Sequence, residues 1–530
     1  MEMKSIVIIL ICFIGISGCG DFLKEQSKDY VYATSCSDLD EVLIGNVYML
    51  NAEKKSASIF STDFSDPFYP WLHVMDDDVA EYNYRSDDTF AKSSSSAGYL
   101  RPYFGWYSDP RMDQNGKFSA DPTWIWFYTA INNANVVIGK VDEFVADPED
   151  TRRRVKGEAL FLRGAYYFLL NNIYAKPYAK ATAKQDLGVP VKLSEYVEDK
   201  YYSRPTNEYV YRQIVKDLNE AADNLAGIEQ KTIYRVNEKA VRTLLSRVYL
   251  YMGEWQLALD ECNKVIELGC PLWNLNNYKV TVEDKDRDFI ISKNSPEVLF
   301  TQAGYSNLNM VMECSNSILA WPYIVSDELM DLFYKYEGEG VTDLRAKTYF
   351  KAVGEEGIHA DRFFARKLPP GMDLSTAWDT YVLRSAEIFL NKAEAEAMLD
   401  KAEAKTTLAD LLKHRFADGN IPNIGDLSGE RLVKFIREER RRELCFECHR
   451  WFDLRRYVVS PKYPETKVIE HKMHAIGVKP PQIKKSLYMK MDGTDAAWVL
   501  PIPNAEISFN DGILQPNDER PDRLTELEYE

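Results

Sequence analysis

Cysteine is scarce in this chain. There are 8 cysteines in 530 residues, which is too few for a disulfide framework in a chain of this length. Apart from Cys12 and Cys19 near the N-terminus, they are Cys36, Cys262, Cys270, Cys314, Cys445 and Cys448. We interpret these six as isolated buried thiols, and we leave open the oxidation of a pair such as Cys262 and Cys270.

The chain also lacks an excess of positive charge and a second long apolar run. Its formal net charge is -17 at pH 7, whereas a protein that binds nucleic-acid phosphates needs a basic face. Beyond the N-terminus no apolar run approaches the roughly 18 residues of a membrane-spanning helix. We therefore expect no nucleic-acid partner and no spanning helix in the body of the protein.

Sequence patterns of several common active sites are missing as well. The chain contains no G-x-x-x-x-G-K-[ST], no G-x-S-x-G and no H-E-x-x-H. Asp284, Asp286 and Asp288 have the opening spacing of a calcium-binding loop, but the positions of its glycine and its last glutamate hold Phe289 and Ser295. We therefore predict no metal and no cofactor.

Two further groups of ionisable residues have ordinary interpretations. The run Asp76–Asp78 with Glu81 contains enough carboxylates for glycoside hydrolysis, but adjacent acids more often form a solvated turn. His471 and His474 lie three residues apart in a proline-flanked segment without a nearby third ligand. We interpret the acids as a solvated or turn-forming face and the histidines as solvated or locally bonded. A surface glycoside hydrolase is kept as an alternative function.

The most informative segment is the first 19 residues. Lys4 precedes an almost unbroken apolar run from Ile6 to Ile16, which is too short for a stable transmembrane helix and is arranged like a secretory signal. The run leads into Ser17-Gly18-Cys19, which resembles a bacterial lipobox. We predict that residues 1–18 are a lipoprotein signal peptide and that Cys19 is lipidated; an ordinary signal peptide is the alternative. Acyl chains anchor a protein by burying methylene groups, at roughly 0.8 kcal/mol each.

Aromatic side chains are abundant. The chain has 10 Trp, 33 Tyr and 24 Phe, or 13% of its residues. Most of these rings must pack in the core or in tight loops. In an exported protein, rings that remain exposed are suited to stacking on sugars or peptides.

Helical periodicity dominates the middle of the chain. Apolar residues recur every three or four positions in the segments 123–144, 151–174, 206–225, 237–252, 254–268 and 383–399. From Ala240 to Leu259, small and large residues are arranged around Gly253 as in a tetratricopeptide helix pair. The pattern predicts a mainly α fold built on tetratricopeptide-like helix pairs.

We predict one domain over residues 19–530. Its helical frame covers approximately 122–270 and 380–458, and long irregular excursions cover approximately 61–121 and 271–378. A third irregular stretch follows at 460–530. Loops of this length in a compact protein are usually functional, so we expect the excursions to carry the ligand side.

The string Cys445-Phe446-Glu447-Cys448-His449 matches C-x-x-C-H, the attachment pattern of c-type haem. It lies within a helical run from 432 to 457, where both cysteines are expected on one face beside apolar side chains. We interpret the cysteines as buried small residues. A haem site, or a metal site shared with another cysteine or histidine, is the alternative.

A run of charged residues, 437–443, precedes this string. It places opposite charges three and four positions apart, as in Glu438 and Arg442, and such exposed helix pairs contribute only about 0.3–0.5 kcal/mol each. Together with Arg450, Asp453 and the arginines that follow, the run predicts a semi-buried ionic network that pins one helix into the scaffold. An anion site is the alternative.

The stretch from Ile436 to Arg456 closely resembles the signature helix of the SusD/RagB family, the surface-exposed glycan- or peptide-binding lipoproteins of Bacteroidetes. Glu443-Leu444, Phe446-Glu447, His449-Arg450 and the segment 451–456 match it, whereas Cys445 and Cys448 stand where the family usually has Ala and Gly. Weaker matches include Asp21 after the lipobox, Leu187-Gly188-Val189-Pro190, Ser203-Arg204-Pro205-Thr206, Asp343-Leu344-Arg345 and a closing segment at 498–507.

This resemblance implies several properties of the chain. It implies a helical tetratricopeptide frame, no catalysis, and attachment to the outer membrane at the cell surface through the lipid. It also implies a SusC-like TonB-dependent transporter as the partner, to which the lipoprotein delivers a bound oligosaccharide or polysaccharide. A RagB-like, peptide-binding lipoprotein is the alternative.

The family's ligand residues lie outside its signature motifs, so the candidates come from the loops. The aromatic candidates are Trp71, Tyr82, Tyr84, Trp106, Tyr107, Trp273, Trp321, Tyr323 and Trp378. Asp76–Asp78, Arg85 and Arg101 are the candidate polar partners. For any single ring, packing within its loop is the competing interpretation.

Overall fold

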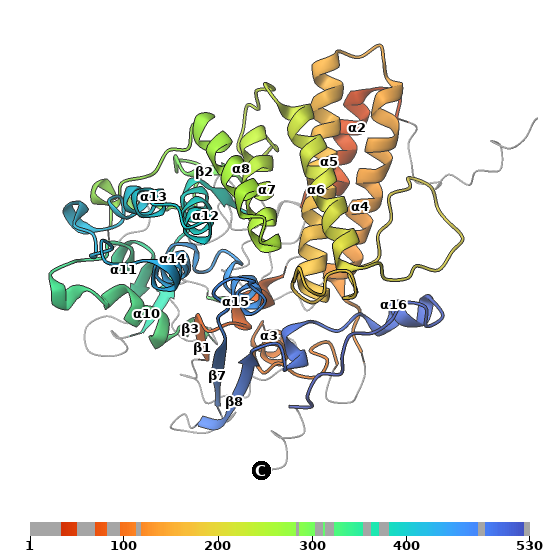
Figure 1. Ribbon diagram of the computed structural model, residues 1–530. Helices are drawn as coiled ribbons and strands as arrows, with labels where there is room; N and C mark the ends of the chain where they lie inside the picture. Colours follow the sequence, from red (N-terminus) through yellow and green to blue (C-terminus); the bar gives the residue numbers. More distant parts are fainter. Residues whose placement is uncertain are drawn as a thin grey trace, which may run out of the picture.

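The structure is a computed structural model of the chain (Figure 1). It describes residues 33–49, 69–81, 96–112, 118–281, 286–302, 311–312, 323–352, 362–369, 381–474 and 483–523. The predicted signal peptide and Cys19 lie outside these residues. None of the described helices combines the length and apolar character needed to cross a membrane.

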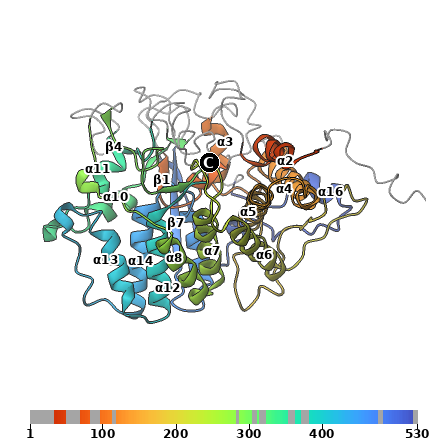
Figure 2. The same ribbon diagram turned by 90° about the horizontal axis from the view of Figure 1, so that it is seen from above.

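Helix pairs form the frame of the molecule. The first helices are α4 (Pro122–Lys140), α5 (Glu149–Tyr174), α6 (Asn207–Leu225), α7 (Glu238–Met252) and α8 (Trp255–Glu267). They are followed by α12 (Ser385–Met398), α13 (Glu403–Leu412) and α14 (Gly429–Leu444). Helix α5 packs between α4 and α6, and α12 packs against α8, α13 and α14. Figure 2 shows these helices following one another from α13 at the left to α4 at the right. The predicted mainly α fold of helix pairs is confirmed.

Local signals in the sequence set the helix ends. The side chains of Asp121, Thr206 and Asn237 each accept a hydrogen bond from a backbone N–H in the first turn of α4, α6 and α7, as good N-caps do. Helix α7 ends at Gly253, whose φ of 69° is left-handed. Glycine adopts this conformation without a steric penalty, so the chain reverses there directly into α8.

Smaller elements lie on the other side of the frame, as Figure 2 shows for β1, α3, α10 and α11. The helical ones are α2 (Cys36–Val42), α3 (Ser96–Phe104), α10 (Asp327–Tyr334), α11 (Arg345–Thr348), α15 (Arg450–Val458) and α16 (Asn504–Phe509). A π-turn covers Leu43–Val47, and 3-10 turns cover Pro70–Val74, Val141–Glu143, Leu275–Asn277, Glu337–Glu339, Ala417–Gly419 and Ala496–Trp498. The stretch 271–378, expected to be irregular, thus contains short regular elements.

The described strands form four antiparallel pairs. They are β1 (Val79–Glu81) with β3 (Tyr323–Val325), β2 (Val298–Phe300) with β6 (Leu383–Arg384), β4 (Phe350–Ala352) with β5 (Phe363–Ala365), and β7 (Lys467–His474) with β8 (Ile483–Met491). The last pair overturns the expectation that 460–530 is wholly irregular. Ile469, His471 and Met473 alternate inward along β7, and the histidine in this series hides the apolar alternation of a strand.

The predicted helical run over 432–457 is wrong at its centre. Helix α14 ends at Leu444 and α15 begins at Arg450, and in the turn between them Phe446 and Cys448 both have φ of 60°. A residue with positive φ leaves the helical conformation. Cys445 and Cys448 therefore do not share a helix face, as we had expected from their spacing.

The described cysteines are all free thiols. Cys36, Cys262 and Cys445 are buried, as predicted, whereas Cys270 and Cys448 are half-buried. Cys262 and Cys270 belong to the same small apolar cluster and remain reduced. Burial raises the pKa of Cys445 to about 12, so this thiol stays protonated. Cys314 lies outside the described residues.

Candidate functional site

Aromatic rings from distant parts of the chain meet around α3. Phe104 at the end of this helix and Trp106 stack on the two sides of the His471 ring, with centroid distances of 3.9 and 4.2 Å. Trp71 stacks on Tyr103 at 5.1 Å, and Tyr323 of β3 lies 5.2 Å from Phe104. The segment 69–81, α3, β3 and β7 therefore share one aromatic layer.

Hydrogen bonds hold this layer in place. The indole Nε1 of Trp106 donates to the carbonyl oxygen of Met75 at 2.9 Å. The His471 ring nitrogens lie 2.7 and 2.8 Å from the carbonyl oxygens of Phe104 and Asp76. Burial lowers the pKa of His471 to about 4, so at neutral pH the ring has one N–H to donate. His471 joins distant segments inside the protein, and our interpretation of it as solvated or locally bonded is wrong.

The structure separates the nine predicted ligand-binding rings into three groups. Trp71, Trp106 and Tyr323 are buried, with exposures of 2%, 0% and 0%. They present no face to solvent and act here as packing. Tyr107 and Trp273 are half-buried. Tyr82, Tyr84, Trp321 and Trp378 lie outside the described residues, as does Arg85.

The two half-buried rings belong to different surroundings. Tyr107 directly follows the aromatic layer, and its ring lies so close to Gly105 that a Cβ there would approach it to 2.4 Å. Trp273 packs against Tyr278 at 5.0 Å, and its backbone N–H donates to Glu297 at 2.8 Å. Of the described candidates, Tyr107 thus lies beside the layer and Trp273 beside a separate charged cluster.

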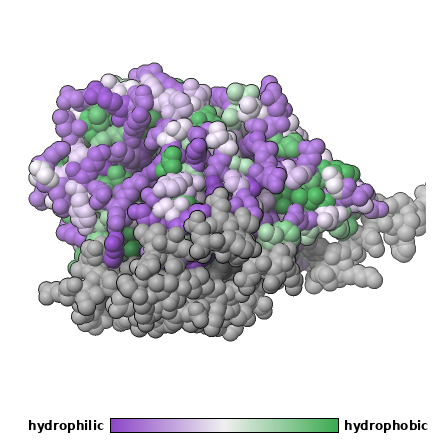
Figure 3. Space-filling view, turned by 90° about the horizontal axis from the view of Figure 1, so that it is seen from below, coloured by the Kyte–Doolittle hydropathy of each residue, from purple (hydrophilic) through white to green (hydrophobic). Residues whose placement is uncertain are grey.

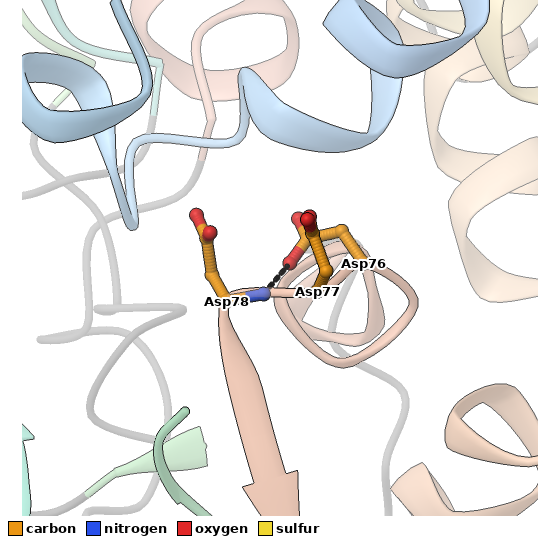
Figure 4. Close-up of side chains that lie close together, drawn as sticks. All are labelled: Asp76, Asp77 and Asp78. Carbon is orange, nitrogen blue, oxygen red and sulfur yellow. Dashed lines mark hydrogen bonds between the residues drawn. The ribbon is translucent and has the colours of Figure 1, made fainter. Parts of the chain in front are cut away.

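The consecutive acids Asp76–Asp78 lie close together (Figure 4), and the carbonyl oxygen of Asp76 is within hydrogen-bond distance of the His471 ring in the aromatic layer. Their exposures are 5%, 6% and 2%, and the backbone N–H of Asp78 donates to Asp76 Oδ1 at 3.0 Å. These acids are therefore not solvated, whereas the turn-forming part of the interpretation is confirmed. Asp76 and Asp77 lie in the bend and turn before β1, and Asp78 leads into that strand.

Positive side chains from three other elements neutralise this acidic run. Arg450 donates from Nε and Nη2 to the two oxygens of Asp77, at 2.7 and 2.8 Å. Arg441 donates to Asp78 Oδ1 at 2.7 Å and to Glu328 at 2.6 Å. Lys467 bridges Asp77 and Glu328. We call this set, Asp76–Asp78 with Glu328, Arg441, Arg450 and Lys467, the acidic node.

The carboxyl groups of the node differ in their pKa. Burial opposes ionisation of Asp77, but Arg441 and Arg450 outweigh it and hold the pKa of Asp77 well below its usual value. Burial, followed by the charges of Asp78 and Asp77, raises the pKa of Asp76 well above its usual value. In the node, Asp77 is thus an ionised carboxylate, whereas the neighbouring Asp76 favours the protonated form.

Two chemical roles considered for these acids fit the geometry poorly. Their carboxylate oxygens lie within 4.8 Å of one another, as in a metal site, but three cationic side chains already contact them. A glycosidase needs two carboxyl groups that face the sugar, whereas Asp77 and Asp78 face buried guanidinium groups. Glu81 is also buried and accepts from the backbone N–H of His474 at 2.6 Å. A structural role accounts for all four acids.

A second charged cluster surrounds the signature stretch. Glu443 accepts hydrogen bonds from Arg384 at 2.7 Å, Arg415 at 2.8 Å and Arg345 at 3.2 Å. Burial opposes ionisation, but these guanidinium groups keep the pKa of Glu443 well below its usual value. Glu447 pairs in turn with Arg384 and Lys367. The predicted semi-buried ionic network is confirmed: Glu443, Glu447 and their partners are buried, whereas Glu438, which pairs with Arg442, is 37% exposed at its edge.

The residues of the C-x-x-C-H string, 445–449, take part in packing and polar contacts inside the protein. The thiol of Cys445 donates to the carbonyl oxygen of Arg442, and Cys448 Sγ lies 3.5 Å from His73 Nε2. His449 is 4% exposed and its Nδ1 lies 3.2 Å from Arg440 Nη2. The two sulfur atoms thus point to different partners. The interpretation of Cys445 as a buried small residue is confirmed.

Sequence reasoning missed the partners of the acidic node. Arg441, Arg450 and Lys467 are 363, 373 and 390 positions from the acids that they contact. One signal was available, because three adjacent acids that follow the apolar segment Pro70–Met75 require nearby cations if they are buried. The sequence could not identify these cations, because only the fold brings them close to the acids.

Comparisons with known proteins agree with this architecture. A family model described as "SusD family" matches residues 325–519, and one described as "Starch-binding associating with outer membrane" matches residues 71–250. The chain belongs to the SusD/RagB family. The SusD family match includes the charged signature stretch. The second match includes the acidic run, helices α4 to α6 and most of α7.

Relatives of this chain have low sequence identity to it, but the similar regions are long. A SusD-like protein of Formosa agariphila is 21% identical over 86% of this chain and 90% of its own length. A SusD-like protein of Bacteroides ovatus is 26% identical over 59% of this chain and 62% of its own length. The first similarity thus extends over most of both proteins.

Solved structures in the family have the same fold. A SusD superfamily protein from Bacteroides thetaiotaomicron has a TM-score of 0.68 at 23% identity, over 91% of this chain and 99% of that one. A SusD-like carbohydrate binding protein from Bacteroides vulgatus has a TM-score of 0.63 at 20% identity, over 90% and 97%.

Proposed function

We propose that this member of the SusD/RagB family is a cell-surface lipoprotein that binds an oligosaccharide or polysaccharide and delivers it to a SusC-like TonB-dependent transporter. The protein would hold its ligand without chemical turnover. Family membership supports carbohydrate binding at the outer membrane. The observation that carries the proposal is the rigid aromatic layer on the acidic node, next to the half-buried ring of Tyr107.

We place the lipid on Cys19. Thirteen residues lie between this cysteine and Ala33, where the described chain begins, and an extended chain over these fourteen positions reaches at most about 50 Å. A lipid on Cys19 would keep the folded body close to the outer membrane. Replacement of Cys19 by Ala should release the protein from the membrane fraction. Retention of the variant in that fraction would contradict lipidation at Cys19.

The ligand site in this proposal consists of rings and polar groups around Tyr107. Tyr82, Tyr84, Trp321 and Trp378 are further candidates from the sequence, with Arg85 and Arg101 as polar partners, and Trp273 is a separate position. Trp71, Trp106 and Tyr323 would support the site from within. Shallow stacking sites typically bind weakly, and a micromolar to millimolar dissociation constant, roughly -8 to -4 kcal/mol, is expected.

A glycan array followed by calorimetry tests this proposal. We expect the folded protein to bind at least one glycan, and Tyr107→Ala to lose about 1–3 kcal/mol of its binding free energy. Tyr209→Ala, at an exposed tyrosine on α6, is the matched control and should bind as the wild type does. Binding of peptides but of no glycan would favour the RagB-like alternative. Release of reducing sugar by the purified protein would contradict a purely binding role.

A further inference from the structure

A small cavity is lined by the first turn of α4 and by helix α16. Helix α16 lies at the right of Figure 1. The volume of the cavity is about 170 Å³, which is less than the roughly 300–1,000 Å³ of pockets for small organic ligands. Apolar walls come from Phe118, Trp124, Ile125 and Pro503. The cavity therefore has the size and lining to accept a single long side chain.

One carboxyl group in the cavity has no positive partner within the part of the chain that the structure describes. Glu506 lines it and accepts a hydrogen bond from Trp124, and burial followed by the charge of Asp121 raises the pKa of Glu506. No ion pair of the described residues includes Glu506. Among the described lining residues Arg111 is the one cation, and its guanidinium is already bonded to Asp109 and Asp121, both at 2.8 Å.

Exposed apolar side chains surround the mouth of the cavity. Phe118 is 46% and Ile125 is 50% exposed. Phe509, one helical turn beyond Ala505 of the lining, is 75% exposed, and Ile513 is 46% exposed. Figure 3 shows hydrophobic residues gathered at the right-hand end of the lower face, the end where α16 lies in Figure 1.

We infer that this surface docks a protein partner which inserts a lysine or arginine side chain into the cavity. An aromatic wall beside a carboxylate attracts a cation through both the ring and the charge. The apolar rim would bury the partner's neighbouring side chains, as in interfaces whose apolar centre carries most of the binding energy. We name the rim and the cavity together the α16 surface.

Charge identifies the kind of partner. Asp109, Asp121 and Glu506 outnumber Arg111 in the lining, and the whole chain carries -17. This negative field repels an anionic lipid surface and favours a basic protein segment. Resting on the function proposed above, we assign the α16 surface to the transporter partner rather than to a second copy of this acidic chain.

The first experiment tests the cavity without the partner. Nuclear magnetic resonance of N-acetyl-arginine amide should detect weak binding to the wild-type protein, and Glu506→Gln should weaken it at least tenfold. N-acetyl-norleucine amide, which lacks the cation, is the control ligand. Failure of the arginine probe to bind, or equal binding to Glu506→Gln, would overturn the inference whatever the transporter does.

The second experiment tests the surface in the assembled membrane. Full-length tagged protein is isolated from outer membranes, and the co-purified TonB-dependent transporter is quantified by mass spectrometry. Phe509→Asp and Glu506→Gln should lower the transporter ratio at least fivefold, whereas Val145→Asp, at a 75% exposed site beyond the other end of α4, should not. Equal ratios would overturn the α16 surface and leave the proposed function intact.

Two further outcomes separate the inference from the proposed function. Glycan binding that persists in Phe509→Asp and Glu506→Gln would place the α16 surface apart from the ligand site, as we expect. Loss of self-association, rather than of the transporter, in these variants would overturn our assignment in favour of a second copy. If wild-type protein co-purifies with no transporter, the proposed delivery fails, and the arginine probe alone decides on the cavity.

Discussion

The guanidinium of Arg450 forms a two-pronged hydrogen bond with the carboxylate of Asp77, at 2.7 and 2.8 Å, across 373 positions of the chain. Paired, parallel N–H···O contacts are among the strongest polar interactions in proteins. Because Asp77 is 6% exposed, little water is available to replace a missing partner. This bond ties the loop before β1 to the first turn of α15.

Removing the negative charge of Asp77 should therefore be costly. Asp77→Asn leaves Arg450, Arg441 and Lys467 facing a neutral amide, and we expect a loss of about 3–5 kcal/mol in the free energy of unfolding. Urea denaturation monitored by circular dichroism measures it. Glu328→Gln, at the exposed edge of the same node, should cost no more than about 1 kcal/mol. Equal losses in the two variants would contradict a buried core of the node.

Acid should destabilise the protein through these carboxylates. Ion pairs lower the pKa of Asp77, Glu443, Glu447 and Asp453 in the folded state despite their burial. Their stabilisation is complete above the unfolded values of about 3.9–4.3 and is lost as the pH falls through the lower folded values. The free energy of unfolding should therefore fall steeply below about pH 4. A flat profile between pH 5 and pH 2.5 would contradict this assignment.

Asp76 should have the opposite effect on stability. Its folded pKa is raised by burial and by the neighbouring acids, so its favourable contribution is present at low pH and is lost as the pH rises through the folded value. Asp76→Asn keeps the acceptor for the Asp78 N–H but cannot ionise. We expect this variant to gain stability over the wild type at pH 7 and to lose that advantage near pH 3, in parallel denaturation curves.

Replacement of Cys448 by glycine should stabilise the folded protein. Its φ of 60° is unfavourable for a residue with a Cβ, and relief of this strain exceeds the entropic cost of glycine in the unfolded chain. Cys448→Gly should raise the free energy of unfolding by about 0.5–1 kcal/mol. Cys448→Val, which places a β-branched residue in the same conformation, is the contrasting variant and should lower it. A melting temperature reduced by Cys448→Gly would show that the contact with His73 matters more than the backbone.

Trp106 should affect stability more than ligand binding. Trp106→Phe keeps a ring against His471 but loses the hydrogen bond to Met75, so we expect a cost of about 1–3 kcal/mol in folding. The folded fraction should retain its glycan affinity within twofold, in contrast to Tyr107→Ala. A large loss of affinity without loss of stability would return Trp106 to the ligand-contacting set.

The sequence predicted those parts of the fold that depend on local pattern. The helix pair around Gly253 and the long helices from α4 to α7 follow from apolar spacing and from capping residues such as Asp121 and Asn237. The turn at Cys445–His449 was missed because no glycine or proline marks it. Within this turn, Glu447 accepts a hydrogen bond from the buried Arg384, a distant contact that the sequence pattern does not reveal.

The candidate site was less accessible to sequence reasoning. Aromatic richness indicated where rings occur but not which of them face solvent, since Trp71 and Tyr107 occupy similar sequence contexts. Burial depends on partners such as Tyr103 and His471 from other segments. The acids of the node were misread for the same reason, because a solvated acid and a buried, paired one differ only in what the distant chain brings to them.

The separation of Asp77 and Asp78 from Arg441, Arg450 and Lys467 along the chain affects when the protein can fold. An amino-terminal fragment, as it leaves the ribosome or a secretion channel, carries three apolar-flanked acids with none of these counter-charges within reach. Its central packing cannot close until almost the whole polypeptide has emerged. Such late completion would suit the proposed lipoprotein, because an exported chain crosses a membrane in an extended form before it takes up its final shape.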